Sequence, residues 1–401
     1  MSRLDEPGGG IDSEHGASAA APARDRSDFA SALLTSLMKS AYSFHTDNVD
    51  IERFGPPSFR TKVSSRARRF VWKVLSALSR GGMILPSSYA DTAIKISELT
   101  PQLRSIEHLY DQLGDDNSRE LLIALITYRL LGATRVRLPL TERDAYRRAV
   151  AKIRSMRVGR ETIDASFLHG RIPLQCFDLS PSGYPIRLFA TAAGLANAFV
   201  LKQYVYRSPS AEVKVAPGDV VIDAGGCWGD TTLFFAHECR AKVFVFEFIP
   251  SNLAVLRRNA GMNHALQDLI HVVPHPVWRT SGTPVFCQDA GPASRVSFER
   301  KSQNDIVVTT KSIDDLVVEN EIDRVDFIKM DIEGAELEAL AGARSVIQKF
   351  RPKLAISIYH RPDDLTAIPR YVQSLGVDYE MFIDHFTIHN EETVLFARPK
   401  R

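Results

Sequence analysis

The spacing of apolar residues divides the chain into two parts of different character. Between residues 29 and 160, apolar residues recur three or four positions apart, as at Leu103, Ile106 and Leu109, and this period predicts mostly helices. The residues before them are rich in Gly, Ala, Ser, Pro and Asp and bury too little apolar surface to fold. The expected domains are a disordered tail at 1–28, a helical N-terminal region at 29–165 and a larger domain at 166–401.

Short β-branched and aromatic runs alternate with helical stretches from about residue 167 onward. The predicted strands are 220–222, 243–246, 270–273, 327–330 and 354–358. The predicted helices between them are 231–239, 251–260, 335–350 and 367–375. Near-continuous apolar strands separated by helices predict an α/β fold with a doubly wound, mostly parallel sheet. Two last runs, 379–383 and 393–397, predict a hairpin at the sheet edge, and 281–318 predicts a β-rich excursion over the functional face.

A glycine-rich turn follows the first strand of this predicted sheet. Gly225, Gly226 and Gly229 come directly after Asp223, and such a turn lets a ligand approach the backbone N–H groups of the next helix. Glu247 ends the second strand, where a carboxylate suits the two hydroxyls of a ribose. Two nucleotide ligands fit this outline, a dinucleotide and S-adenosylmethionine. The plain alternative is a turn that only packs a helix on a strand.

The glycine spacing favours S-adenosylmethionine over a dinucleotide. The G-x-G-x-x-G pattern fails in both registers, because other residues occupy two of the three glycine positions: Cys227 and Asp230, or Trp228 and Thr231. Asp230 at the helix start would repel a pyrophosphate but tolerates a sulfonium and an ammonium, and Asp223 is expected to face that ammonium directly or through water. The expected cofactor contacts are Asp223, Gly225, Gly226, Gly229, Asp230, Thr231, Glu247 and Phe248. Tyr204 is expected to stack on the cofactor or close the pocket, or else only to pack at the domain junction.

Two carboxylates mark the end of the fourth strand. Asp331 and Glu333 follow 327–330, and Gly334 behind them permits a close approach. The carboxyl ends of strands in an open α/β sheet are where ligands bind, so the pair suits base or metal chemistry. Helix capping is the plain alternative, although capping needs only one of them.

The chain contains two motifs that are informative in combination. They are Val221-Ile222-Asp223-Ala224-Gly225 with Gly229-Asp230-Thr231, and Lys329-Met330-Asp331-Ile332-Glu333-Gly334-Ala335-Glu336. Over about residues 183–398 this pattern resembles the FkbM family of S-adenosylmethionine-dependent methyltransferases. The resemblance implies a class I, Rossmann-like methyltransferase fold and O-methylation of a hydroxyl, commonly of a sugar, a glycan or a secondary metabolite.

Methyl transfer to oxygen needs alignment and a proton acceptor. The oxygen must lie opposite the sulfur, and a base or a metal must help to remove its proton. His360 and His385 follow the fifth and sixth strands and are expected near Asp331. We expect His360 or Asp331 to be the base, with Glu333 and His385 orienting the acceptor. The alternatives are a divalent metal held by Asp331, His360 and His385, and histidines that are only hydrogen-bonded.

The charge balance and the cysteine content limit the classes of partner and the cellular compartment that can be expected. Lys and Arg total 50 against 48 Asp and Glu, so the net charge of +2 does not indicate nucleic-acid binding. Four cysteines without a CxxC indicate a reducing compartment, and no apolar run approaches the ~20 residues of a membrane span. We therefore expect a cytoplasmic protein. The expected partner is a small-molecule or glycan acceptor, as the family resemblance implies. The basic residues in 59–80 fit a solvated helix face or, alternatively, contact with a membrane or a glycan carrier. A non-catalytic Rossmann-like module and an NAD-dependent oxidoreductase are the competing functions.

Overall fold

The computed structural model describes residues 27–45, 47–50, 94–142, 144–164 and 173–400. The predicted tail before residue 27 and the basic stretch 59–80 lie outside these residues. Within them, no helix is both long and apolar enough to cross a bilayer.

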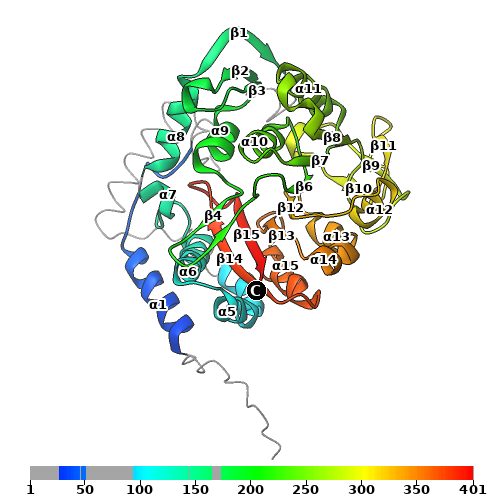
Figure 1. Cartoon of the computed structure of the whole chain (residues 1–401). Helices are drawn as coiled ribbons and strands as arrows, with labels where there is room; N and C mark the ends of the chain where they lie inside the picture. Colours follow the sequence, from blue (N-terminus) through cyan, green and yellow to red (C-terminus); the bar gives the residue numbers. More distant parts are fainter. Residues whose placement is uncertain (1–26, 46, 51–93, 143, 165–172, 401) are drawn as a thin grey trace, which may run out of the picture.

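A seven-stranded sheet forms the centre of the molecule (Figure 1). Its strands, in spatial order, are β14 (Tyr379–His385), β15 (Thr393–Pro399), β13 (Lys353–Ser357), β12 (Phe327–Met330), β6 (Val220–Ala224), β7 (Lys242–Phe246) and β8 (Ile270–Val273). The strands from β13 to β8 are parallel, while β15 runs antiparallel to both of its neighbours. The predicted strands and the edge hairpin are confirmed.

Alternate residues of each strand face opposite helical layers, which explains the near-continuous apolar runs. Val221 and Val243 belong to the core that includes α10 (Asp230–Glu238) and α11 (Pro250–Met262). Their neighbours Ile222 and Phe244 belong to the core on the other face. That second core includes residues from α12 (Ile313–Glu319), α13 (Glu336–Ala341), α14 (Arg344–Phe350) and α15 (Asp364–Ser374). The single helix predicted at 335–350 is therefore two helices.

The N-terminal helices share this core. Phe29 in α1 (Ser27–Ala41), Leu109 in α5 (Leu103–Gln112) and Leu122 in α6 (Asp116–Leu131) are buried in the same cluster as Met381 of β14. The Gly114 N–H also donates to the Met381 carbonyl at 2.8 Å. These helices thus complete the covering of the sheet near β14.

The predicted helical region is wrong at its end. After α7 (Pro139–Glu142) and α8 (Ala145–Arg154), the chain forms β1 (Arg157–Ile163). This strand pairs with β2 (Leu174–Asp178), which pairs in turn with β3 (Arg187–Ala190). The remaining connections are α9 (Ala192–Leu195), a π-helix (Ala196–Leu201), β4 (Tyr206–Arg207) and β5 (Glu212–Val213). Most of β1 is exposed, so it carries little of the apolar alternation by which a strand is recognised.

The excursion over the functional face forms its own small sheet. β9 (Pro284–Cys287) pairs with both β10 (Val296–Ser297) and β11 (Ile306–Thr309), as predicted from 281–318. A short 3-10 turn, Gly291–Ala293, lies between β9 and β10. The end of the predicted range is helical instead, because Ile313 begins α12 after an N-cap by Ser312.

Candidate active site

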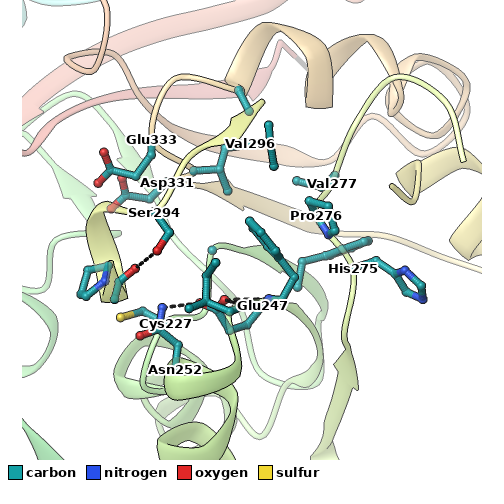
Figure 2. Close-up of a pocket in the computed structure, with 18 residues that line it drawn as sticks. Cys227, Glu247, Asn252, His275, Pro276, Val277, Ser294, Val296, Asp331 and Glu333 are labelled. Carbon is teal, nitrogen blue, oxygen red and sulfur yellow. Dashed lines mark hydrogen bonds between the residues drawn. The ribbon is translucent and has the colours of Figure 1, made fainter. Parts of the chain in front are cut away.

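Two cavities lie at the carboxyl ends of the central strands. The smaller one is walled by the turn after β6, the segment from Phe246 to Asn252, residues 275–277 after β8, and residues 291–296 (Figure 2). The larger one has a volume of about 950 Å³ and extends toward α9, the π-helix and β1. Gly225, Cys227, Asp331 and Glu333 line both cavities, so the two spaces meet between the ends of β6 and β12.

The turn after β6 packs directly on the backbone after β12. Gly225 has a φ of +86°, and a Cβ at this position would overlap the carbonyl oxygen of Asp331. Cys227 and Glu333 also hold positive φ angles, of +47° and +56°, although neither is glycine. Such backbone strain tends to concentrate at functional sites, and here it occurs where the two cavities meet.

Asp223 does not line either cavity. Its side chain is fully buried, and Oδ2 accepts hydrogen bonds from the hydroxyls of Thr231 at 2.9 Å and Thr232 at 2.7 Å. Its Oδ1 lies 3.0 Å from the ammonium of Lys329, which also donates to the Gly225 carbonyl at 2.6 Å. The prediction that Asp223 faces a cofactor ammonium directly is therefore wrong. Asp223 instead anchors the start of α10 and, through Lys329, the glycine turn.

Asp230 is the partly buried acid that faces the larger cavity at this turn. It lies with Thr231 on the wall of the larger cavity, while Gly229 before it makes the turn with a φ of +85°. Burial raises the pKa of Asp230 to about 6, although the charge of Lys329 opposes the rise. The side-chain oxygen Oδ2 of Asp230 lies beside Gly194, the third residue of α9. Of the two acids in this turn, Asp230 is the one that can meet a cation in the cavity.

Glu247 closes the smaller cavity at the end of β7. Its Oε1 accepts from the N–H groups of Phe248 and Ile249 at 2.6 and 2.8 Å, and its Oε2 from the Asn252 amide at 3.2 Å. Figure 2 shows Glu247 and Asn252 together on one side of the cavity, with Asp331 and Glu333 on another. Burial raises the pKa of Glu247 to about 7, although these hydrogen bonds oppose the rise. Asn252 Oδ1 is buried and has no hydrogen-bond partner among the described residues.

Asp331 lies where the cavities meet and is held by two tyrosines. The Tyr204 hydroxyl donates to Oδ2 at 2.9 Å, and the Tyr359 hydroxyl donates to Oδ1 at 3.2 Å. Burial alone would raise the pKa of Asp331, but the charges of His360 and Lys329 and the Tyr204 hydroxyl together lower it. Tyr204 also lines the larger cavity, so its hydroxyl and ring contribute to the wall.

Glu333 is the more accessible carboxylate of the pair. Its side chain is 27% exposed, and Oε2 lies 3.4 Å from Arg295 on the excursion. Burial raises the pKa of Glu333 above its ordinary value, and the charge of His360 opposes the rise. Neither Asp331 nor Glu333 caps a helix, since α13 begins later, at Glu336, after Ala335 at the N-cap.

His360 lies behind these carboxylates and lines neither cavity. Its side chain is 3% exposed, with Nδ1 2.8 Å from Glu336 and Nε2 3.3 Å from Asp331. Burial lowers the pKa of His360, but the hydrogen bond to Glu336 and the charges of Asp331 and Glu333 raise it to about 9. The structure does not support His360 as the base, because the imidazole lines neither cavity and both of its nitrogens face carboxylates.

His385 belongs to another polar cluster. Its Nδ1 lies 2.9 Å from the Thr393 hydroxyl and its Nε2 lies 3.5 Å from that of Thr387. Burial lowers the pKa of His385 to about 3, so the imidazole is neutral. The predictions that His385 orients the acceptor or joins a metal site are wrong: His385 lines neither cavity, and the ligand-like group around Asp331 contains Glu336 and His360 instead.

Three residues that support the site have no separate signal in the sequence. Lys329 and Glu336 stood inside the recognised motif, but their roles depend on which strands become neighbours. Asn252 gave no signal of its own, since an Asn in the first turn of a helix is ordinary. All three become identifiable once burial and hydrogen-bond partners are known.

One family model and several solved structures are similar to this chain. Residues 216–379 match the family model described as the methyltransferase FkbM domain. A crystal structure of methyltransferase FkbM from Methylobacillus flagellatus is similar at 20% identity and a TM-score of 0.49, over 84% of this chain and 72% of that chain. Among curated proteins no match was found.

Two more distant structures are also similar. Precorrin-6y C5,15-methyltransferase from Geobacter metallireducens is 12% identical over 51% of this chain and 88% of that chain, with a TM-score of 0.31. Aeropyrum pernix fibrillarin, solved with S-adenosyl-L-methionine, is 11% identical over 56% and 93%, also with a TM-score of 0.31. The central sheet has the class I, Rossmann-like methyltransferase arrangement, five parallel strands extended by an antiparallel hairpin. Residues 216–379 thus match the methyltransferase FkbM domain, which supports the resemblance stated from the sequence for that part of the chain.

Proposed function

We propose that this domain transfers a methyl group from S-adenosylmethionine to a hydroxyl of a sugar, a glycan or a secondary metabolite. The observation that carries the proposal is the meeting of two cavities at Gly225, Cys227, Asp331 and Glu333. A donor in one cavity and an acceptor in the other would bring their reacting atoms together at this point, as an in-line transfer requires.

The smaller cavity fits the adenosine end of the donor. Glu247 supplies carboxylate oxygens for two ribose hydroxyls, and the buried Asn252 Oδ1 offers an acceptor that such a ligand would satisfy. Val277 and Ile332 give the cavity apolar walls for a flat base. All four side chains line the smaller cavity in the structure as it stands.

The charge at the junction fits the cationic end of the donor. Asp230, Asp331 and Glu333 all line the larger cavity close to the glycine turn. They would attract a sulfonium and an ammonium, and Asp230 takes the ammonium role first expected of Asp223. The same carboxylates would repel a dinucleotide pyrophosphate, which argues against an NAD-dependent oxidoreductase.

The larger cavity suits a polar acceptor of substantial size. Its walls include Gln175, Asn197, Gln203 and Arg157, and Asn197 Oδ1 is buried without a hydrogen-bond partner among the described residues. Hydroxyl groups of an acceptor would satisfy such amides. The polar lining is the support for a sugar-like or similarly hydroxylated compound.

The chain's own residues would then orient the acceptor and take its proton. When bound, S-adenosylmethionine supplies the methyl carbon, which bonds to the acceptor oxygen as its bond to sulfur breaks. Glu333 has the accessible carboxylate at the junction and accepts the hydroxyl proton. Asp331, fixed by Tyr204 and Tyr359, holds the acceptor hydroxyl in place.

Isothermal titration calorimetry of the full chain tests the donor assignment. S-adenosylmethionine and S-adenosylhomocysteine are expected to bind one to one, and NADH is expected to give no binding heat, because the junction is acidic. The Glu333→Gln variant should weaken binding of S-adenosylmethionine more than that of S-adenosylhomocysteine, because only the former carries the sulfonium charge that Glu333 is proposed to attract. Heat with NADH but not with either sulfur compound would contradict the proposal.

A further inference from the structure

We propose that His360, Asp331 and Glu333 form a divalent-cation site, with Glu336 orienting His360 from behind. This set differs from the one expected from the sequence, because Glu333 replaces His385 as a ligand. Two of the three proposed ligands, Asp331 and Glu333, line both cavities. The site itself does not depend on the proposed function, but its role in the reaction does.

The geometry around His360 Nε2 is that of a ligand aimed at its neighbours. Nε2 lies 3.3 Å from Asp331 Oδ1 and 3.8 Å from Glu333 Oε1. Ligand atoms that share one ion at about 2.1 Å lie roughly 3.0–3.5 Å from each other. Asp331 and His360 already belong to one group of ligand atoms within 4.8 Å of one another, and Glu333 would have to turn toward them to complete the set. Nε2 is buried and makes no hydrogen bond within the described part of the chain. Its close contact there is the ion pair with Asp331 Oδ1 at 3.3 Å, and a metal ion would take the place of the proton in that contact.

The other side of the imidazole is arranged as in known metal sites. Nδ1 lies 2.8 Å from Glu336 Oε1, and the same oxygen accepts the Ile332 N–H at 3.0 Å. A carboxylate on one ring nitrogen fixes the ring and makes the other nitrogen a better ligand. Because Ile332 lies between Asp331 and Glu333, Glu336 also fixes the backbone that carries both carboxylates.

The local charge favours an added cation. Three carboxylates, those of Asp331, Glu333 and Glu336, surround the single imidazole. Lys329 pairs with Asp223 at 3.0 Å, whereas Arg295 lies 3.4 Å from Glu333 and offsets part of its charge, so an ion bound by Glu333 would compete with Arg295. One nitrogen and two carboxylate ligands suit Mn²⁺ or Zn²⁺ better than Ca²⁺, which takes oxygen ligands.

The position gives such an ion a defined role. It would lie at the junction of the cavities, where the acceptor hydroxyl is proposed to meet the methyl group. A divalent ion there would bind the hydroxyl oxygen and ease the loss of its proton to Glu333 or to water. Metal dependence of methyl transfer would follow, whereas binding of S-adenosylhomocysteine would not require the ion.

The test titrates the metal alone into the full chain. Protein stripped with EDTA is titrated with MnCl₂ and ZnCl₂ by calorimetry, and Mn²⁺ binding is followed by electron paramagnetic resonance. We expect one site in the wild type, its loss in Glu333→Gln and His360→Gln, and about 10–100-fold weaker binding in Glu336→Gln. His264→Gln, at an exposed position outside the cluster, is the matched control and should bind as the wild type does.

Two outcomes would overturn the site. Stripped wild-type protein that binds neither ion would do so, as would equal affinity in the wild type and Glu333→Gln. The latter variant alters a partly exposed side chain, so it should fold even if His360→Gln does not. S-adenosylhomocysteine is titrated into the same samples, so that loss of the metal site and failure of the proposed methyl donor are told apart.

Discussion

The variant Lys329→Met is expected to lose about 3–5 kcal/mol of its free energy of unfolding. The ammonium is almost fully buried, 3.0 Å from Asp223 Oδ1, and it donates to the Gly225 carbonyl at 2.6 Å. Removing it leaves the Asp223 carboxylate buried without its counter-charge. This destabilises a protein more than replacing both charged groups does. Urea unfolding followed by circular dichroism measures the loss.

A double variant shows that the charge is responsible. Asp223→Asn combined with Lys329→Met should be more stable than Lys329→Met alone, because the orphaned charge is gone. Lys349→Met, at an exposed helix position, is the matched control and should change stability by less than about 0.5 kcal/mol. An equal loss in the single and the double variant would show that Lys329 acts through packing.

The variant Glu247→Gln is expected to weaken binding of S-adenosylhomocysteine by about ten- to a hundredfold. A hydrogen bond to a charged group contributes about 1.5–3 kcal/mol, and the amide gives up that charge where two ribose hydroxyls are proposed to bind. Calorimetry on the wild type and the variant measures the difference. Glu299→Gln, at an exposed position in the excursion, is the control, and a variant that binds as tightly as the wild type would refute the ribose role.

The pH dependence of binding provides a second test of Glu247. Its pKa is raised to about 7 by burial, and the ionised form is the one that accepts from two hydroxyls. Affinity should therefore be constant above pH 7 and fall by up to tenfold per unit below it. In Glu247→Gln the fall in affinity near pH 7 should be absent, and only a fall near pH 6 should remain, because protonation of Asp230 would weaken its contact with the ammonium. A fall that still begins near pH 7 in this variant would show that Glu247 is not the titrating group.

Local signals in the sequence were enough for the sheet and the glycine turn. The strand runs and the spacing around Gly225 depend on residues close together in the chain, and the structure contains them as expected. Glu247 was likewise identified from its place at a strand end, and it lines the smaller cavity. These features follow from period and turn chemistry, which a single sequence carries.

Roles that depend on neighbouring strands were not predictable in the same way. Lys329 and Asp223 are register partners on β12 and β6 but lie 106 residues apart in sequence. Their ion pair, which holds the Asp223 side chain away from the cavities, can therefore be recognised only once the two strands are known to be neighbours. His385 ends a strand like Asp331 does, but β14 is the edge strand, separated from β12 by β15 and β13. A shared sheet edge does not by itself bring two side chains together.

A crystal structure of the complex with S-adenosylhomocysteine tests the account most directly. It should show the ribose hydroxyls on Glu247 in the smaller cavity and the sulfur at Gly225, facing the larger cavity across Asp331 and Glu333. A ligand bound elsewhere, or one whose sulfur turns away from the larger cavity, would contradict the assignment of donor and acceptor to these two spaces.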